Sequence, residues 1–443
     1  MANPLSNLLR SSFLRQVGVL ISSALLTQMV PFLFAPLLTR LFVPHDFGVV
    51  ALYVAIVNVG CSIVTGRYEL AIVLPRSSRQ AHLLLAIAIG WAFIINVLLF
   101  VLLLLGLSLI HTGLRSDAWL FLFLPLSIFL AASLQSVNCW LNRQQRYYPI
   151  SVSNSAQRLL TVISSAILGV AHIKSGLLYG QVMGKVLTPI VLLKVLSEIY
   201  QKLRRDFSRK WIRRLLKRYR RFPLYSAPSS LINALSTASP IILLSLFFRQ
   251  TEIGLYALSV RVLMLPVSVL SRNIGQVFLS RAQQLKLTPE VLTRQVASWS
   301  TLVALPIFGV LVLCGPVLFS WFFGAAWRVA GQYTQLMSFW LFYVFLTHPI
   351  SMLLVIKEQQ HKNLLFDVLL LAARLASIAI GAIWLKNMLI TVALFAGLGA
   401  LLWCGYAVYL FRLAQQRYRF IMAILILPLI MLCCLGMLSF LIR

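Results

Sequence analysis

Four basic residues lie deep inside apolar stretches of this sequence, where charged side chains are rare. They are Arg158, Lys185, Arg261 and Arg374. Placing such a charge at the centre of a membrane helix costs about 2.5–3.5 kcal/mol on insertion scales. We therefore expect these side chains to line a water-filled cavity that binds an anion. Arginine offers phosphate a two-pronged donor and lysine a compact charge, so phosphate is the expected anion.

Acidic and titratable partners for these cations are few. Asp367 precedes Arg374 by two helical turns, so the two lie on one face of a helix and could form an ion pair. The alternative is that Asp367 pairs with a cation on a neighbouring helix. His348 fits either proton coupling or an ordinary hydrogen-bonded interior histidine. Asp367 and His348 are the candidate ion-coupling residues. The alternative to a ligand is that backbone carbonyls and helix C-termini stabilise the cations.

A second polar group, Arg67 and Glu69, ends the second apolar stretch. One interpretation is that these side chains bind a head group or gate the inner mouth of a cavity. The other is a salt bridge, either between the two or with a neighbouring helix.

The elements that position these residues are expected to be membrane-spanning helices. The chain has 443 residues, of which 60% are hydrophobic and 11% charged, and its mean hydropathy is +0.91. Apolar stretches of about 20 residues, enough to cross a bilayer, recur along it. They cover residues 17–42, 47–65, 82–108, 118–140, 150–171, 176–196, 224–248, 253–272, 298–323, 333–356, 364–385, 388–411 and 421–442.

This pattern predicts an all-α polytopic membrane protein with two six-helix lobes around a central cavity. The lobes are residues 1–197 and 223–412, with a linker at 198–222 and an additional C-terminal span within 413–443. A short repeat supports the division, because residues of the first lobe match the second at a constant offset. The matched residues are Phe42, Asp46, Phe47, Gly48, Ala51 and Leu52 with Phe248, Glu252, Ile253, Gly254, Ala257 and Leu258. An acid that caps each helix is an alternative reason for the match.

The net charge of +30 is distributed by topology. Basic residues concentrate in alternate loops, which places the N-terminus in the cytoplasm by the positive-inside rule. This distribution argues against nucleic acid as a partner. The linker 198–222 has an apolar residue at every fourth position from Ile199 to Tyr219, typical of an amphipathic helix on an anionic lipid surface. Docking of a cytoplasmic enzyme is the alternative for this helix.

No motif for nucleotide hydrolysis, metal binding or nucleophilic catalysis occurs in the sequence. The six cysteines lie within apolar stretches, without the spacing of a zinc site. We expect no cofactor, no metal and no enzymatic activity.

Several segments resemble the Wzx-type oligosaccharide flippases of the polysaccharide transporter family, within the multidrug/oligosaccharidyl-lipid/polysaccharide exporter superfamily. The segments are DFG at 46–48, RYELAIVLP at 67–75, YRRFPLYSAP at 219–228, GLYAL at 254–258 and QVF at 276–278. They cover about the first two thirds of the chain. The thirteenth span departs from the usual twelve.

The resemblance implies a bacterial inner-membrane carrier that moves undecaprenyl pyrophosphate-linked oligosaccharide, such as O-antigen units for lipopolysaccharide biosynthesis, to the periplasmic leaflet by alternating access. It implies a lipid-linked oligosaccharide as partner and raises glycan polymerase machinery as another, while the basic linker adds anionic phospholipids. Two alternatives stay open. One is a membrane polymerase or ligase acting on the same lipid-linked sugar, and the other is a cation-coupled multidrug exporter, whose cavity should contain acids.

Overall fold

The computed structural model describes residues 29–109, 122–173, 175–186, 188–193, 197, 209–268, 289–351, 353–354, 357 and 359–441. Three expectations therefore fall wholly or partly outside the described residues. They are most of the first predicted span, the first part of the linker (198–208) and the QVF segment at 276–278.

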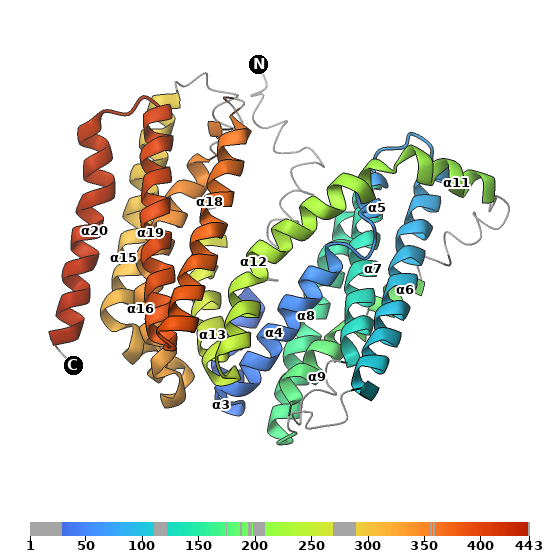
Figure 1. Cartoon of the computed structure of the whole chain (residues 1–443), viewed down its shortest axis with the longest axis horizontal. Coiled ribbons are helices and arrows are strands. Elements are labelled where there is room, and N and C mark those ends of the chain that lie inside the picture. The colour runs from blue at the N-terminus through green and yellow to red at the C-terminus, as the bar shows by residue number, and fades with distance from the viewer. Residues whose placement is uncertain are drawn as a thin grey trace, which may run out of the picture. The chain divides into compact units, whose positions relative to one another are not determined.

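The chain forms two compact units, each with its own helices (Figure 1). Unit 1 consists of Met1–Phe42 and Val49–Ile242, and unit 2 of Val43–Gly48 and Leu243–Arg443. The division falls inside a helix, α12, whereas the sequence predicts lobes that meet at the linker 198–222. The last helix, which the sequence treats as a separate segment, belongs to unit 2.

Unit 1 is built from α-helices with short irregular turns. Its elements are α3 (Ala35–Leu41), most of α4 (Pro44–Cys61), α5 (Tyr68–Ala71), α6 (Ser78–Leu109), α7 (Leu124–Arg143), α8 (Tyr147–Val170), α9 (Gly176–Met183), the 3₁₀ turn η2 (Gly184–Val186), α11 (Arg209–Arg218), the π-helical turn η3 (Phe222–Ser226) and most of α12 (Ala227–Phe247).

Unit 2 is also helical over its described residues. Its elements are α13 (Gln250–Pro266), α15 (Pro289–Phe323), the 3₁₀ turn η5 (Ala325–Trp327), α16 (Arg328–Ile350), α18 (Gln360–Ala379), the π-helical turn η6 (Ile380–Trp384), α19 (Met388–Leu413) and α20 (Tyr418–Leu441). The thirteenth apolar stretch is α20, which packs along α15 (Figure 1).

Within the described part of the chain, nine helical segments are long and apolar enough to cross a membrane. Backbone polar groups in hydrocarbon must be paired internally, which a helix achieves within one segment. The predicted all-α membrane fold class is confirmed.

One expectation about the linker needs correction. The sequence places its apolar stripe on the membrane surface, but in α11 the stripe packs into the protein. Leu215 and Tyr219 are buried in a cluster with residues of α5, α6 and α7, and Trp211 packs against the same cluster. The guanidinium of Arg79, on α6, lies 5.4 Å from the centre of the Trp211 ring. The apolar face of α11 is therefore covered by α5, α6 and α7. Its basic residues Arg213, Arg214, Lys217 and Arg218 are exposed.

Candidate functional site

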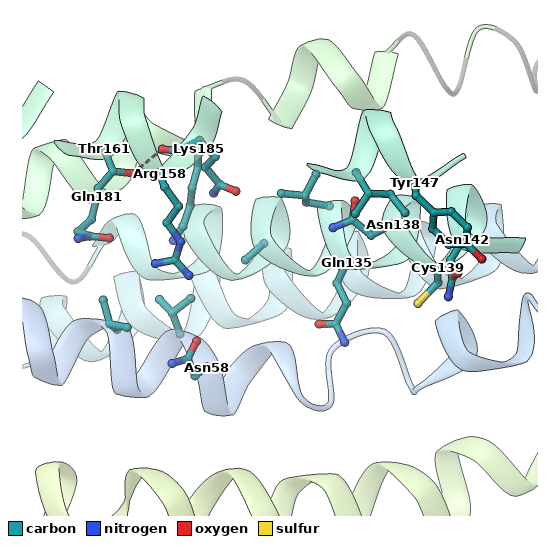
Figure 2. Close-up of a pocket in the computed structure, with 16 residues that line it drawn as sticks. Asn58, Gln135, Asn138, Cys139, Asn142, Tyr147, Arg158, Thr161, Gln181 and Lys185 are labelled. Carbon is teal, nitrogen blue, oxygen red and sulfur yellow. Dashed lines mark hydrogen bonds between the residues drawn. The ribbon is translucent and has the colours of Figure 1, made fainter. Parts of the chain in front are cut away.

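Unit 1 contains a cavity of about 750 Å³ that brings together two of the predicted cations (Figure 2). It is lined from α4, α7, α8, α9 and η2. Its polar lining residues are Asn58, Gln135, Asn138, Cys139, Asn142, Tyr147, Gln157, Arg158, Thr161, Gln181 and Lys185. The volume lies within the range of about 300–1,000 Å³ common to small-molecule sites.

Close packing of α8 on α9 and η2 places Arg158 beside Lys185. A Cβ added to Gly180 would lie 2.8 Å from the backbone nitrogen of Ser165 on α8, and one added to Gly184 would lie 2.9 Å from Cβ of Thr161. Small residues four apart let membrane helices approach closely. Because Lys185 directly follows Gly184, this contact carries its side chain to the wall that holds Arg158.

The electrostatics of this wall favour an anion. Arg158 and Lys185 are close enough to interact as like charges, and no carboxylate is among the residues that line the cavity. Lys185 Nζ lies 5.9 Å from the ring centre of Tyr53, whose hydroxyl donates to Ser127 Oγ at 2.6 Å. A cation–π contact compensates only part of a desolvated charge. A bound anion would relieve the remaining repulsion.

The far part of the cavity is polar but uncharged. In Figure 2 the Arg158 guanidinium points toward Asn58 on α4, while Asn138, Asn142 and Tyr147 gather at the other end. The Oδ1 atom of Asn138 is buried without a hydrogen-bond partner among the described residues. Amides and a tyrosine can donate to and accept from sugar hydroxyls. One end of the cavity therefore suits phosphate and the other suits sugar.

The sequence interpretation missed these amides. Gln135, Asn138 and Asn142 share a face of α7 at helical spacing, and Gln157 and Thr161 do so on α8 around Arg158. Amides recurring at such intervals within an apolar span are the signal that could have identified them.

Arg67 and Glu69 form a salt bridge with each other at 3.3 Å, one of the two alternatives above. Glu69 is fully buried and also accepts a hydrogen bond from Thr65 Oγ1 at 2.5 Å. Gly66 and Arg67 both have φ of 59°, a left-handed conformation uncommon for arginine. These contacts hold the turn between α4 and α5.

The remaining predicted residues lie in unit 2. Arg374, on α18, lies 5.8 Å from the ring centre of Trp340 and interacts electrostatically with Asp367. Arg261 is exposed on α13, and His348 is half-buried on α16. An ion pair between Asp367 and Arg374 stays a prediction. The roles of these four residues in binding or coupling stay predictions.

The polysaccharide biosynthesis protein family has a sequence model that matches residues 37–332. The chain belongs to this family. The match spans α3 to the start of α16 and includes every residue that lines the cavity. No curated protein matches the chain in sequence.

Several solved structures of membrane transporters are similar in fold to this chain. The lipid II flippase MurJ in an inward closed conformation matches with a TM-score of 0.69 and 14% identity, over 94% of this chain and 97% of that one. A mutant of the Vibrio cholerae MATE transporter VcmN gives a TM-score of 0.51 at 12% identity, over 92% and 97%. An inward-facing multidrug resistance MATE transporter of the MOP superfamily gives 0.50 at 15% identity, over 94% and 95%. This chain therefore shares the fold of these proteins.

Proposed function

We propose that this protein is a flippase that moves undecaprenyl pyrophosphate-linked oligosaccharide, for O-antigen or another surface polysaccharide, across the bacterial inner membrane. The observation that carries the proposal is the cavity of unit 1, with Arg158 and Lys185 at one end and amides at the other. Membership in a polysaccharide biosynthesis family supports a glycan as cargo.

The cationic end of the cavity replaces the hydrogen bonds and charge stabilisation that water gives to a pyrophosphate. An isolated anion in hydrocarbon is prohibitively expensive unless it is paired and hydrogen-bonded. Arg158 can donate two parallel hydrogen bonds to phosphate oxygens, and Lys185 adds a second positive charge. The two cations lower the free energy of the head group inside the membrane.

The amide end of the cavity supplies hydrogen bonds to sugars, while the polyprenyl chain stays in lipid. The protein forms no covalent bond in this scheme. Alternating access between the two sides of the membrane then moves the head group.

A cation-coupled drug exporter is the competing function within the same fold. An exporter of cationic drugs is expected to place carboxylates in its cavity, but none is among the residues that line this one. Binding of organic cations in preference to lipid pyrophosphates would reverse the assignment.

The proposal is tested by flipping in reconstituted vesicles. We expect Arg158→Gln and Lys185→Gln each to slow translocation of a lipid-linked oligosaccharide about tenfold or more, because each removes a charge-assisted hydrogen bond worth about 1.5–3 kcal/mol. Arg261→Gln and Arg374→Gln are expected to slow it as well. The measurement is the fraction of labelled sugar accessible to an external reagent over time.

Arg220→Gln is the matched control, since Arg220 is exposed and does not line the cavity. Size-exclusion profiles establish that each variant is folded. Wild-type rates in both the Arg158 and Lys185 variants would exclude this cavity as the phosphate site.

A further inference from the structure

A second cavity in unit 1, separate from the first, is also lined by basic residues. It has a volume of about 710 Å³ and shares no lining residue with the larger cavity. Its polar lining comes from the turn before α6, the start of α6, the end of α7 and the turn between α7 and α8. The polar residues are Arg76, Ser78, His82, Arg143, Gln144 and Arg146.

The three arginines of this cavity differ in their roles. Arg143 donates to the backbone carbonyls of Ile72 at 3.0 Å and Val73 at 3.1 Å, so it fixes the turn that forms one wall. Arg76 and Arg146 are exposed and line the cavity from opposite turns. Together they present two guanidinium groups to the same space.

The cavity has no acidic residue in its lining, and it also contains a buried histidine. His82 is 8% exposed, and its ring centre lies 6.1 Å from that of Trp140, which lines the same cavity. The first turn of α6, a helix of 32 residues, contributes Ser78 and Ala81, and a helix N-terminus adds partial positive charge. Each feature favours an anion with several acceptor oxygens.

We propose that this second cavity binds a phosphate group, with the head group of an anionic phospholipid as its source. Val73 and Leu74 line the cavity and are 51% and 59% exposed, so an apolar rim adjoins the arginines. A lipid would place its phosphate among the arginines and its acyl chains along this rim. Free phosphate offers the same oxygens without using the rim. The inference concerns a site apart from the transport cavity and does not depend on the proposed function.

The test uses full-length protein in detergent with three probes. Native mass spectrometry measures retention of phosphatidylglycerol and of diacylglycerol, which lacks the phosphate, and calorimetry measures inorganic phosphate. We expect the double variant Arg76→Gln/Arg146→Gln to bind phosphatidylglycerol about tenfold more weakly than wild type, since it loses two charge-assisted contacts. Diacylglycerol binding should not change.

Arg213→Gln/Lys217→Gln is the matched control, because it removes two exposed charges from α11 without touching the cavity. It should bind phosphatidylglycerol within about threefold of wild type. If only inorganic phosphate binding depends on Arg76 and Arg146, the phosphate site stands with a free ion as its source. If neither probe distinguishes the cavity variant from wild type, or the control is weakened equally, the proposal is overturned.

Discussion

At the scale of single residues, the carboxylate of Glu69 shows how burial decides what a charge does. It is fully buried and is held by Arg67 and by Thr65, all three within one turn of the chain. A buried carboxylate with two donors is satisfied locally. This geometry supports a structural role, although a gate that opens by breaking the ion pair would use the same residues.

Replacing Glu69 with glutamine separates these two roles. We expect Glu69→Gln to lower the free energy of unfolding by about 2–3 kcal/mol, because it leaves the partly buried Arg67 without its anionic partner. The measurement is thermal unfolding in detergent followed by circular dichroism. The double variant Arg67→Gln/Glu69→Gln should recover part of the loss. An unchanged melting temperature together with lost flipping would instead identify the pair as a gate.

The four basic residues within apolar stretches are recognisable from the sequence because each lies far from either end of its stretch. Their position within the apolar stretches could not show which of them share a binding site. Arg158 and Lys185 meet because α8 and α9 touch, whereas Arg374 lies over Trp340 in the other compact unit. The amides around Arg158 were missed because neutral polar residues do not stand out in a hydropathy profile as charges do.

At the scale of elements, small residues decide how helices approach. Gly180 sits against the Ser165 backbone, and Gly184 against Thr161, so α9 and η2 lie close to α8. No backbone atom can move out of the way of an added side chain without separating the helices. The position of Lys185 therefore depends on a glycine five residues away.

We expect Gly180→Ala to destabilise the protein by about 1–3 kcal/mol, as overpacking does, and to reduce flipping by displacing Lys185 from Arg158. Gly90→Ala is the matched control, because a Cβ at Gly90 in α6 meets no atom within 4 Å. The readouts are melting temperature and vesicle flipping rate. Equal behaviour of the two variants would contradict the packing argument.

For the linker helix α11, the sequence predicted the helix but not the surface against which it packs. The apolar residue at every fourth position correctly predicted a helix with one apolar face over the described part, residues 209–218. The spacing could not say which apolar surface would cover that face. The protein itself provides that surface, an apolar cluster formed by α5, α6 and α7. Leu215 and Tyr219 are buried in this cluster instead of in the membrane surface.

At the scale of the whole molecule, the two copies of the short sequence repeat contact each other. The segment Val43–Gly48, which includes the first turn of α4, belongs to unit 2 together with α13. A Cβ added to Gly48 would meet the carbonyl of Gln250, and one added to Gly254 would meet the carbonyl of Pro44. The matched positions of the two copies thus touch each other's helix start. Glu252 also caps its own helix by accepting from the Arg249 backbone at 3.1 Å.

This contact predicts that both glycines are intolerant of substitution. We expect Gly48→Ala and Gly254→Ala each to lower the free energy of unfolding by at least about 1–3 kcal/mol, because the added carbon would lie 2.7–2.8 Å from a carbonyl carbon that cannot rotate away. The fraction of monodisperse protein after extraction and its melting temperature provide the measurement. Gly397→Ala, where a Cβ meets no atom within 4 Å, should match wild type. A tolerated alanine at both repeat positions would contradict this account.

What the sequence by itself determined was the all-α membrane class, the approximate position of the spans, the depth of the cations and the repeat. These are local properties, since a span is recognised from about 20 consecutive residues and their hydropathy. Tertiary structure alone decided that Arg158 and Lys185 share a cavity with amides and that α11 packs on α5, α6 and α7. Those outcomes depend on which faces of distant helices meet, and that depends on close packing between residues far apart in the chain.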